Sequence, residues 1–242
     1  MSKKVLFIGD IHGVTDWEQI VQSSLAYFYE IVFLGDYVDS FFISAGEQLY
    51  NLNNICSFAR KNKERVTLLL GNHDYAYIYN HPGIGGHQYE HIHDFKKIFQ
   101  DNIDLFQIAW GYTNPDTQKY TLATHAGLTI RFWNNYVKPE LKEGGFLYQF
   151  TNGVDCPIHE ALNYMQDKEI IWKVGRARHG MGTPGPLWAD YIEMIEERYK
   201  GINQVFGHTP QLTARVDQYE DDFIACIDSR GNRKAESLLI TL

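Results

Sequence analysis

The sequence of 242 residues predicts an α/β fold with stacked sheets. Apolar runs of strand length alternate with helix-like stretches, and this alternation is typical of α/β domains. Several of these runs end in glycine followed by a polar cluster, as at the ligand-binding edge of such a sheet. The hydrophobic fraction of 44% is enough for one sizeable core. We find no repeat or linker, so we expect one domain over residues 1–242.

Each expected element has its own local pattern. The clearest helix spans 45–61, where Leu49, Leu52 and Ile55 lie on a one-sided apolar stripe. Residues 129–186 are less periodic and richer in Gly, Pro, Trp and Tyr, so we expect an insertion or small cap over the sheet edge. We expect buried strands at 5–8, 31–34, 66–70, 121–124, 204–206, 223–227 and 237–241, and helices at 16–29, 45–61, 94–101, 158–167 and 188–200.

The bulk composition argues against several partners. The formal net charge of −8 is unfavourable for binding duplex nucleic acid or anionic lipid. No apolar run approaches the roughly 18 residues of a membrane-spanning helix. The first apolar run meets Asp10 too early for a signal peptide. The three cysteines are widely spaced without a CxxC pair, which indicates reduced thiols and a cytoplasmic location.

Polar clusters follow five of the expected strands. Each cluster alone is weak, since a strand-end histidine is more often structural and "GNHD" is also consistent with a turn. Five clusters in the same context, most of them after a glycine, instead indicate a shared site at the carboxyl ends of the strands. The five are "FIGDIHG" (7–13), "FLGDYVD" (33–39), "LLLGNHD" (68–74), "TLATHAG" (121–127) and "VFGHTP" (205–210), which supply Asp10, His12, Asp36, Asn72, His73, His125 and His208.

The residue types in these clusters indicate metal ions. Carboxylate, imidazole and carboxamide without thiolate suit Mn, Fe, Zn, Co or Ni rather than a closed structural zinc site. Asp36 is the natural bridge between two ions, because one carboxylate can bind both. Two ions about 3.5–4 Å apart can acidify a water molecule and bind phosphoryl oxygens. Asp10 and His12 would then complete one site, and Asn72, His125 and His208 would complete the other.

The ordered set GD-x-HG, GD-x-VD, GNH-[DE], HAG and GHT resembles the calcineurin-like metallophosphoesterases. It is most similar to the PPP-type branch, which includes serine/threonine phosphoprotein phosphatases, phage phosphatases and symmetrical dinucleoside tetraphosphatases. The resemblance continues through "GPLWADY" (185–191) and "FIACIDSRGNRKAESLLITL" (223–242), so it covers nearly the whole chain. It implies a four-layer α/β/β/α sandwich and is specific for the superfamily rather than for a substrate.

The resemblance also implies roles for individual residues. His73 would protonate or stabilise the leaving oxygen, and Asp39 would hold the useful tautomer of His73. A turn-capping aspartate is the alternative for Asp39, and Asp74 is expected to support the metal ligands. The family's two divalent metal ions, with Mn²⁺ preferred, would be bound by Asp10, His12, Asp36, Asn72, His125 and His208.

The sequence departs from the pattern of the protein phosphatases at two arginines. These enzymes read GDYVDRG and RGNHE, whereas Ser40 and Leu70 stand at the corresponding positions here. Bidentate binding of phosphate by those arginines is therefore lost. Arg176 or Arg178, upstream of "PLWAD", is the expected replacement, although both could be surface residues. Arg131 is a weaker candidate.

The aromatic and histidine side chains near the motifs each allow two interpretations. The aromatics could stack on a base, but we expect them to line the cap or fill the core. The histidines of the segment 79–94 could form a third metal site, but we expect a solvated loop near the site. The aromatics are Phe41, Phe42, Tyr75, Tyr77, Tyr79 and Trp133, and the histidines are His81, His87, His91 and His93.

We therefore expect a hydrolase acting on phosphomonoesters, either a phosphoprotein or small phosphate esters. The reaction implied by the family is in-line attack on phosphorus by a metal-bridging hydroxide. A dinucleoside polyphosphate or cyclic-nucleotide hydrolase is the alternative. A catalytically silent phosphate-binding module would be expected to have lost a ligand or His73, and none is missing. A DNA-repair nuclease would be expected to have a basic groove, which the acidic charge disfavours.

Overall fold

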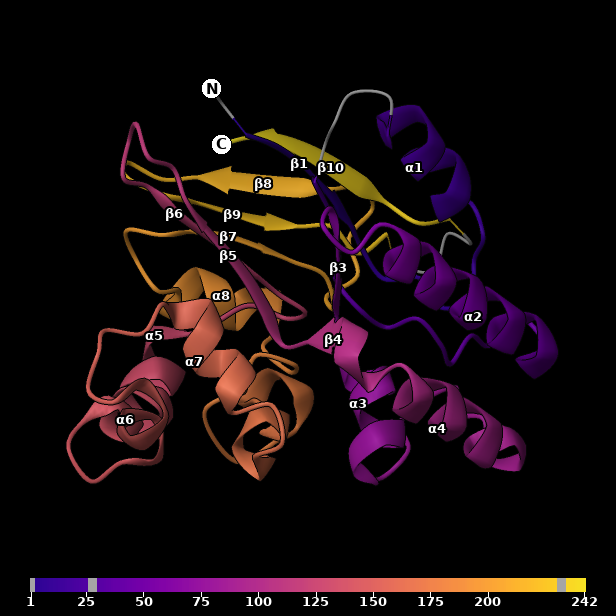
Figure 1. The fold of residues 1–242 in the computed structure, drawn as a ribbon, viewed down its shortest axis with the longest axis horizontal. Coiled ribbons are helices and arrows are strands. Elements are labelled where there is room, and N and C mark those ends of the chain that lie inside the picture. Colours follow the sequence, from indigo (N-terminus) through magenta and orange to yellow (C-terminus); the bar gives the residue numbers. More distant parts are fainter. Residues whose placement is uncertain (1–2, 26–29, 230–233) are drawn as a thin grey trace.

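The computed structural model describes residues 3–25, 30–229 and 234–242, which form two five-stranded mixed sheets (Figure 1). Sheet A has the strand order β10-β1-β2-β3-β4, and sheet B has the order β5-β6-β7-β9-β8. The strands are β1 (Lys4–Ile8), β2 (Glu30–Phe33), β3 (Val66–Leu69), β4 (Phe106–Gln107), β5 (Ala109–Thr113), β6 (Tyr120–Thr124), β7 (Asn203–Phe206), β8 (Arg215–Gln218), β9 (Phe223–Cys226) and β10 (Ser237–Thr241).

The helices lie in two groups in Figure 1, with α1 to α4 on one side and α5 to α8 on the other. The α-helices are α1 (Trp17–Leu25), α2 (Ala45–Lys61), α3 (Asn72–Tyr79), α4 (Ile92–Asp101), α5 (Ile130–Phe132), α6 (Phe146–Thr151), α7 (Ile158–Tyr164) and α8 (Tyr191–Glu197). Shorter 3₁₀ or π turns are η1 (Tyr89–His91), η2 (Ile103–Leu105), η3 (Trp133–Val137), η4 (Lys138–Leu141), η5 (Glu169–Trp172) and η6 (Arg176–Arg178).

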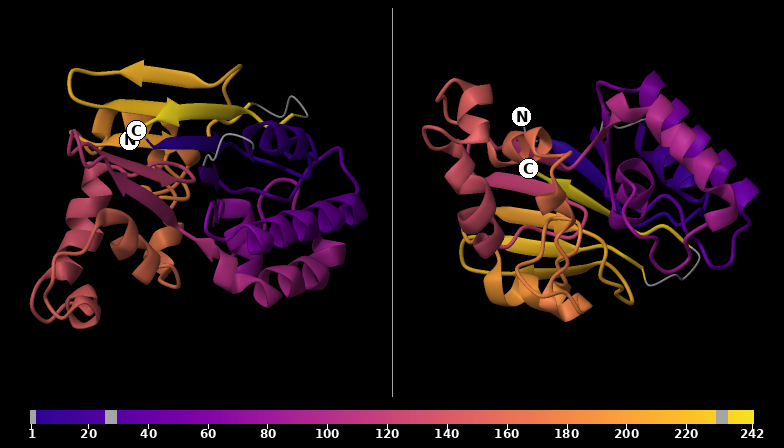
Figure 2. Two further views of the ribbon diagram at one scale, coloured as in Figure 1. Left: turned by 45° about the horizontal axis from the view of Figure 1, so that its top comes forward. Right: turned by 90° about the horizontal axis from the view of Figure 1, so that it is seen from below.

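Alternation along the strands produces the layers, because successive side chains point to opposite faces. On β1, Leu6 and Ile8 join the core cluster that includes α1, α2 and α4. Val5 and Phe7 join a second cluster with β7 and β9 of sheet B. Phe206 on the outer face of sheet B packs in a third cluster with α8. The expected α/β/β/α order is therefore confirmed, and Figure 2 shows the layers from two further sides.

Parallel pairing brings the polar clusters together at one edge. In sheet A, β1 pairs in parallel with β2 and β2 with β3, so their carboxyl ends are neighbours. In sheet B, β6 pairs in parallel with β7. Backbone hydrogen bonds continue beyond the strands, from the His12 N–H to the Asp36 carbonyl at 2.7 Å and from the Gly207 N–H to the His125 carbonyl at 2.7 Å.

All seven expected strands are present with small shifts of their ends, but three further strands were missed. β5 contains a glycine in mixed polarity, β4 has two residues, and β8 is a polar edge strand that pairs with β9 through its backbone. Helix α2 has the expected bounds. The expected helix at 188–200 begins at Tyr191 instead, because the Asp190 side chain caps it by accepting from the Ile192 N–H at 3.1 Å. Of the expected helix at 16–29, residues 26–29 lie outside the described residues.

The segment 129–186 folds into short helices and turns. Its buried side chains, including Phe132, Leu147 and Leu162, join the core cluster that sheet A shares with α1, α2 and α4. That this segment caps the site stays a prediction. The described part of the chain contains no helix with the length and apolarity to cross a bilayer. Cys56, Cys156 and Cys226 are all free thiols.

Candidate active site

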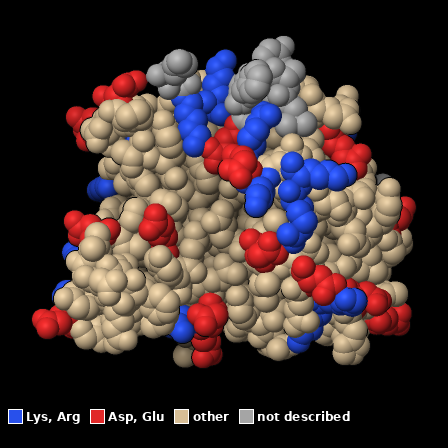
Figure 3. All heavy atoms as spheres, viewed as in Figure 1, with Lys and Arg blue, Asp and Glu red and all other residues tan. Residues whose placement is uncertain are grey.

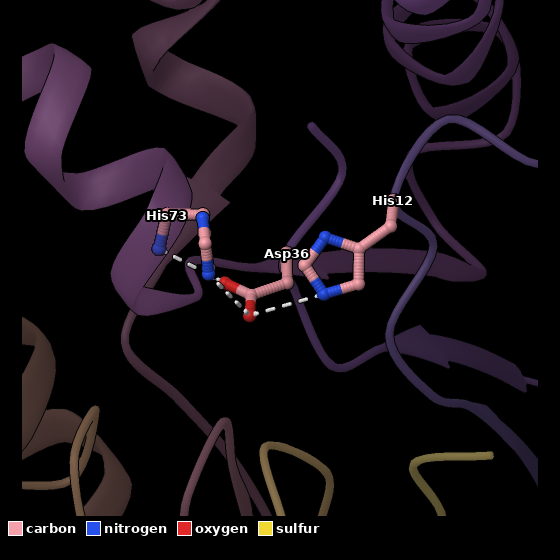
Figure 4. A group of neighbouring side chains, drawn as sticks. All are labelled: His12, Asp36 and His73. Carbon is pink, nitrogen blue, oxygen red and sulfur yellow. Dashed lines mark hydrogen bonds and ion pairs between the residues drawn. The ribbon is translucent and has the colours of Figure 1, made fainter. Parts of the chain in front are cut away.

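Asp36 lies between histidines from two different segments of the chain. It follows β2, His12 follows β1, and His73 lies in the first turn of α3. Figure 4 shows the rings of His12 and His73 on either side of the Asp36 carboxylate. His12 Nε2 is 3.7 Å and His73 Nε2 is 4.0 Å from Asp36 Oδ2. We call these three residues the open group, because the His12 side chain is 33% exposed.

A second set of donor atoms is more tightly packed around the same carboxylate. Asn72 Oδ1 is 2.9 Å from His125 Nε2 and 3.0 Å from His208 Nδ1. The two imidazole nitrogens are 3.1 Å apart, and His125 Nε2 is 3.4 Å from Asp36 Oδ2. We call Asp36, Asn72, His125 and His208 the closed group, since all four are buried. Ligands of one ion at about 2.0–2.2 Å and near 90–110° lie about 2.9–3.5 Å apart, which matches this spacing.

The hydrogen bonds of the histidines fit metal binding. His125 Nδ1 donates to the Leu34 carbonyl at 2.8 Å, and His12 Nδ1 donates to the Val38 carbonyl at 2.7 Å. A carbonyl oxygen only accepts, so the lone pair of each neutral ring lies on Nε2, the atom that faces Asp36. Metal-binding histidines are usually fixed in this way. In His208, Nδ1 is the nitrogen that lies beside Asn72 and His125, and the buried Nε2 has no partner among the described residues.

Asp10 lies beside the closed group. Its carboxylate does not belong to either cluster of three donor residues around Asp36, which are Asp36 with His12 and His73, and Asp36 with His125 and His208. Its carboxylate accepts from the His208 backbone N–H, at 3.0 Å to Oδ1 and 3.2 Å to Oδ2. Where the sequence assigns Asp10 and His12 to one ion, the structure groups the donor atoms of His12 and Asp36 with His73. Whether Asp10 or His73 binds the ion next to His12 is therefore a question for experiment.

Two further aspartates hold the site in place. His73 Nδ1 donates to Asp39 Oδ2 at 2.8 Å, which is the contact expected of a residue that orients the imidazole. The Asp74 carboxylate accepts from the backbone N–H groups of Asp36 at 2.7 Å, Tyr37 at 2.9 Å and Gly71 at 2.9 Å. Asp74 therefore joins the start of α3 to the turn that carries Asp36.

The backbone is strained where the side chains converge. His12, Asp36, Asp39 and His208 all have positive φ, between 41° and 68°, which residues other than glycine rarely adopt. Such strain is typical of functional sites. The glycines before the polar residues have a steric reason, since a Cβ at Gly71 would lie 2.1 Å from Asp36 Oδ1.

The sequence was compared with models of known protein families. The model of the calcineurin-like phosphoesterase family matches residues 3–213. The chain is a calcineurin-like phosphoesterase. The match spans most of the chain and includes all the strand-end clusters. Family membership confirms the hydrolase class and the use of divalent metal ions that the motifs predicted.

Solved structures share the fold of this phosphoesterase. A cold-active protein-tyrosine phosphatase from the psychrophile Shewanella sp. has a TM-score of 0.59 and 17% identity, covering 98% of this chain and 75% of that one. A protein serine/threonine phosphatase from Saccharomyces cerevisiae, with similarity to human phosphatase PP5, has a TM-score of 0.50 and 11% identity, covering 99% and 80%. A search of curated proteins finds no significant sequence match.

Charges at the centre of the phosphoesterase compensate one another. Burial disfavours a charged Asp36, but His125, His73 and His12 hold its pKa well below the ordinary value. Burial likewise disfavours a charged His125, but Asp36 raises the pKa of this imidazole to about 10. A proton and a metal ion compete for the same lone pair on His125. Burial together with Asp228 raises the pKa of Asp10 well above the ordinary value.

The structure separates the candidate arginines. Arg178 Nε donates to Asp190 Oδ2 at 2.8 Å, and its Nη2 lies 3.3 Å from the His208 carbonyl. Arg176 is exposed in the same turn, and Arg131 pairs with Glu197 on α8. Of the three, Arg178 is the one in contact with a residue of the closed group.

The histidines of segment 79–94 are not uniformly solvated, and our expectation was wrong for His87. Its side chain is 2% exposed and its Nδ1 is 3.4 Å from Asp39 Oδ2. His81 stacks on Trp172 at 4.3 Å, whereas His91 is half-exposed and pairs with Asp94. His87 is buried because its ring packs against Tyr77, which the sequence pattern does not reveal.

The aromatics near the motifs differ in exposure, and Tyr79 is partly buried against the core. Tyr75, Tyr77 and Trp133 are buried in the core, as expected. Phe41 and Phe42 are instead 75% and 69% exposed, just after Asp39. The sequence also gave no reason to single out Trp188, whose Nε1 is buried without a partner among the described residues and whose ring is 5.5 Å from that of His208.

Proposed function

We propose that this phosphoesterase hydrolyses phosphomonoesters with the help of two divalent metal ions. Mn²⁺ is the preferred ion at both positions. The observation that carries the proposal is the sharing of Asp36 by the open and closed groups. One carboxylate offers two oxygens and can therefore bind neighbouring ions. When bound, such a pair would acidify a water molecule and withdraw charge from the phosphoryl oxygens.

The closed group would hold one ion through Asn72, His125, His208 and Asp36. Asp10 and His12 would hold the other with the same Asp36 carboxylate. This set of oxygen and nitrogen donors without thiolate suits Mn, and also Fe, Zn, Co or Ni.

His73 is proposed to assist the leaving group rather than to bind a metal. Asp39 holds its Nδ1, so Nε2 is the atom available to the substrate. Because Nδ1 keeps its own proton for Asp39, His73 can donate from Nε2 only as the imidazolium. Burial disfavours this form, but Asp36 and Asp39 raise the pKa of His73 and so favour it. As a water oxygen bonds to phosphorus and the P–O bond to the leaving group breaks, the bonding electron pair stays on the leaving oxygen, which takes the Nε2 proton. General acid assistance of this kind is usually worth about 10²–10⁴ in rate.

Arg178 is proposed to contact the phosphoryl oxygens in place of the missing arginines. Its bond to Asp190 orients the guanidinium, and its side chain is still 28% exposed, so it can reach a ligand. Bidentate binding by arginine provides both charge and orientation for phosphate.

The two solved relatives are described as protein phosphatases, which favours a phosphoprotein or a small phosphate ester as the substrate. One observation favours the second candidate, a dinucleoside polyphosphate or cyclic nucleotide. A surface cavity of about 630 Å³ is lined by Gly13, Phe42 and Tyr50, close to His12 and Asp39 in sequence. Exposed aromatic rings at such a cavity could stack on a base.

The distribution of charged side chains on the surface favours a small substrate over duplex nucleic acid. On the face in Figure 3, Lys and Arg gather in the upper middle but lie among acidic side chains. A duplex-binding surface needs a continuous basic stripe that neutralises several phosphates.

A substrate panel with the Mn²⁺-loaded protein tests the proposal. The panel is p-nitrophenyl phosphate, bis-p-nitrophenyl phosphate, a phosphopeptide and a dinucleoside tetraphosphate. We expect turnover of the monoesters. Turnover of the dinucleotide or diester alone would establish the second candidate, and no turnover with both ions bound would indicate a phosphate-binding module.

A further inference from the structure

The buried carboxylate of Asp39 has more partners than His73. Its side chain is 0% exposed, so its charge depends on protein donors. His73 Nδ1 lies 2.8 Å and His87 Nδ1 lies 3.4 Å from Oδ2, and the Tyr77 hydroxyl donates to Oδ1 at 2.6 Å. The carboxylate therefore has a hydrogen-bond partner at both oxygens without water.

Tyr77 is itself held in one position. Its side chain is buried, and its hydroxyl oxygen accepts from the Gln88 backbone N–H at 2.9 Å. Its ring stacks on the His87 ring with centroids 4.3 Å apart and planes 23° apart. Burial and the Asp39 charge raise the pKa of Tyr77, so the hydroxyl keeps its proton and donates it to the carboxylate.

The loop before η1 lies directly on Asp39. Gly86 has a φ of 85°, and a Cβ there would lie 2.2 Å from the Asp39 carbonyl oxygen. Gln88 Nε2 donates to the Gly86 carbonyl at 2.6 Å and lies 3.4 Å from the Ser40 carbonyl. Through Gly86 and Gln88 the loop therefore lies over the backbone of Asp39 and Ser40.

From these contacts we infer that Tyr77 and His87 are positioning residues for His73. They fix the Asp39 carboxylate, and Asp39 in turn fixes the His73 ring with Nε2 towards Asp36 (Figure 4). Without them, Asp39 can turn away and His73 loses the geometry for proton donation. The inference rests on the proposed function of His73 as the proton donor.

Tyr77→Phe tests the inference, with Tyr75→Phe as the matched control. Both tyrosines are buried on α3 and each donates one short hydrogen bond, but that of Tyr75 goes to the Gln166 carbonyl at 2.8 Å. We expect similar small losses of melting temperature for the two variants. Only Tyr77→Phe should lower turnover, and equal turnover in both variants would overturn the inference.

The leaving group provides a readout that a structural role would not affect. Proton donation matters more for the basic phenolate of phenyl phosphate than for p-nitrophenolate. We expect Tyr77→Phe to lower kcat about tenfold on phenyl phosphate and less than threefold on p-nitrophenyl phosphate, with KM unchanged. An equal loss on both substrates would contradict the inference.

His87 is tested by two substitutions that separate its ring from its N–H. His87→Phe keeps a ring to stack on Tyr77 but removes the donor, and we expect a three- to fivefold loss of kcat on phenyl phosphate. His87→Asn can place an amide N–H near the position of Nδ1 and should restore part of this activity. Full activity of His87→Phe would remove His87 from the network.

A spectroscopic readout separates this inference from the proposed function. In the Zn²⁺-loaded protein, the Nδ1 proton of His73 should give a downfield NMR resonance that is absent in His73→Asn. Tyr77→Phe should shift or broaden this resonance, while Tyr75→Phe should not. An inactive wild-type protein with this response would refute phosphomonoester hydrolysis but retain the positioning, whereas an unmoved resonance would refute the positioning itself.

Discussion

The closed and open groups share Asp36 but differ in packing. Neighbouring donor atoms in the closed group are 2.9–3.4 Å apart and come from buried residues. In the open group, His12 and His73 nitrogens lie 3.7 and 4.0 Å from the carboxylate oxygen, and both side chains are partly exposed. If the two groups hold ions as proposed, the closed side is preorganised for one of them and the open side leaves room for water and substrate. Catalytic metal sites need such an open position.

The difference has a structural origin. His125 and His208 follow parallel strands of sheet B, and His125 reaches across to the Leu34 carbonyl of sheet A. The closed group is therefore held between the two sheets. His12 and His73 belong instead to a loop after β1 and to the start of α3, both at the edge of sheet A.

Asp36→Asn should affect both groups at once. Removing the shared carboxylate charge should release both ions and lower turnover by about a thousandfold or more, since metal ions supply several kcal/mol of transition-state stabilisation. Metal analysis of the purified variant and an assay with p-nitrophenyl phosphate measure this. Asp94→Asn, at an exposed carboxylate, is the control. Full metal occupancy in Asp36→Asn would contradict the bridge.

His73→Asn should affect only the open side. We expect the variant to keep two ions and to lose about 10²–10⁴ in kcat, because the proton donor is removed and no ligand is. Metal content and kcat are measured on the same preparation. Loss of one ion would instead make His73 a ligand, as its nearness to Asp36 allows.

His125→Ala and His12→Ala should differ in stability when the metal-free variants are compared in urea. His125 is fully buried, so its removal leaves the Leu34 carbonyl without its partner and should cost about 2–4 kcal/mol. The half-buried His12 should cost about 1 kcal/mol. Equal losses would mean that the closed group is no more tightly packed than the open one.

Arg178→Ala and Arg176→Ala should differ in phosphate binding. Arg178 contacts the closed group through the His208 carbonyl, so its removal should raise the inhibition constant of inorganic phosphate about tenfold, or about 1.4 kcal/mol. Arg176→Ala should change it less than twofold. If the two variants behave alike, the phosphate is bound by other groups.

Much of the fold could be predicted from the sequence because its signals are local. The continuous apolar run of β1 and the one-sided apolar stripe of α2 are each visible within a few consecutive residues. β8 was missed because an exposed edge strand is held by backbone pairing with β9 and needs no apolar pattern. Helix α3 was missed because eight residues with three tyrosines carry no helical stripe, and packing of Tyr75 and Tyr77 stabilises it.

The site was predicted in composition but not in arrangement. The glycines were visible in the sequence, but the close approach of Gly71 to Asp36 became visible only in the folded chain. Arg176 and Arg178 are two residues apart and equivalent in sequence, yet only Arg178 points to Asp190 and His208. His87 resembled a solvated loop residue until its stacking on Tyr77 was seen.

The family, the layered α/β fold and the residue types at the five strand ends can all be predicted from the amino-acid sequence. Only the packing of the folded chain shows which of these residues form the closed group, that His73 joins His12 and Asp36 in the open group, and that Tyr77 and His87 contact Asp39. The two kinds of information differ in how far apart the residues are in the chain. An apolar strand and a polar residue after a glycine are properties of a few consecutive residues. Distances between side chains depend instead on how two sheets and their loops pack, which joins residues far apart in the chain.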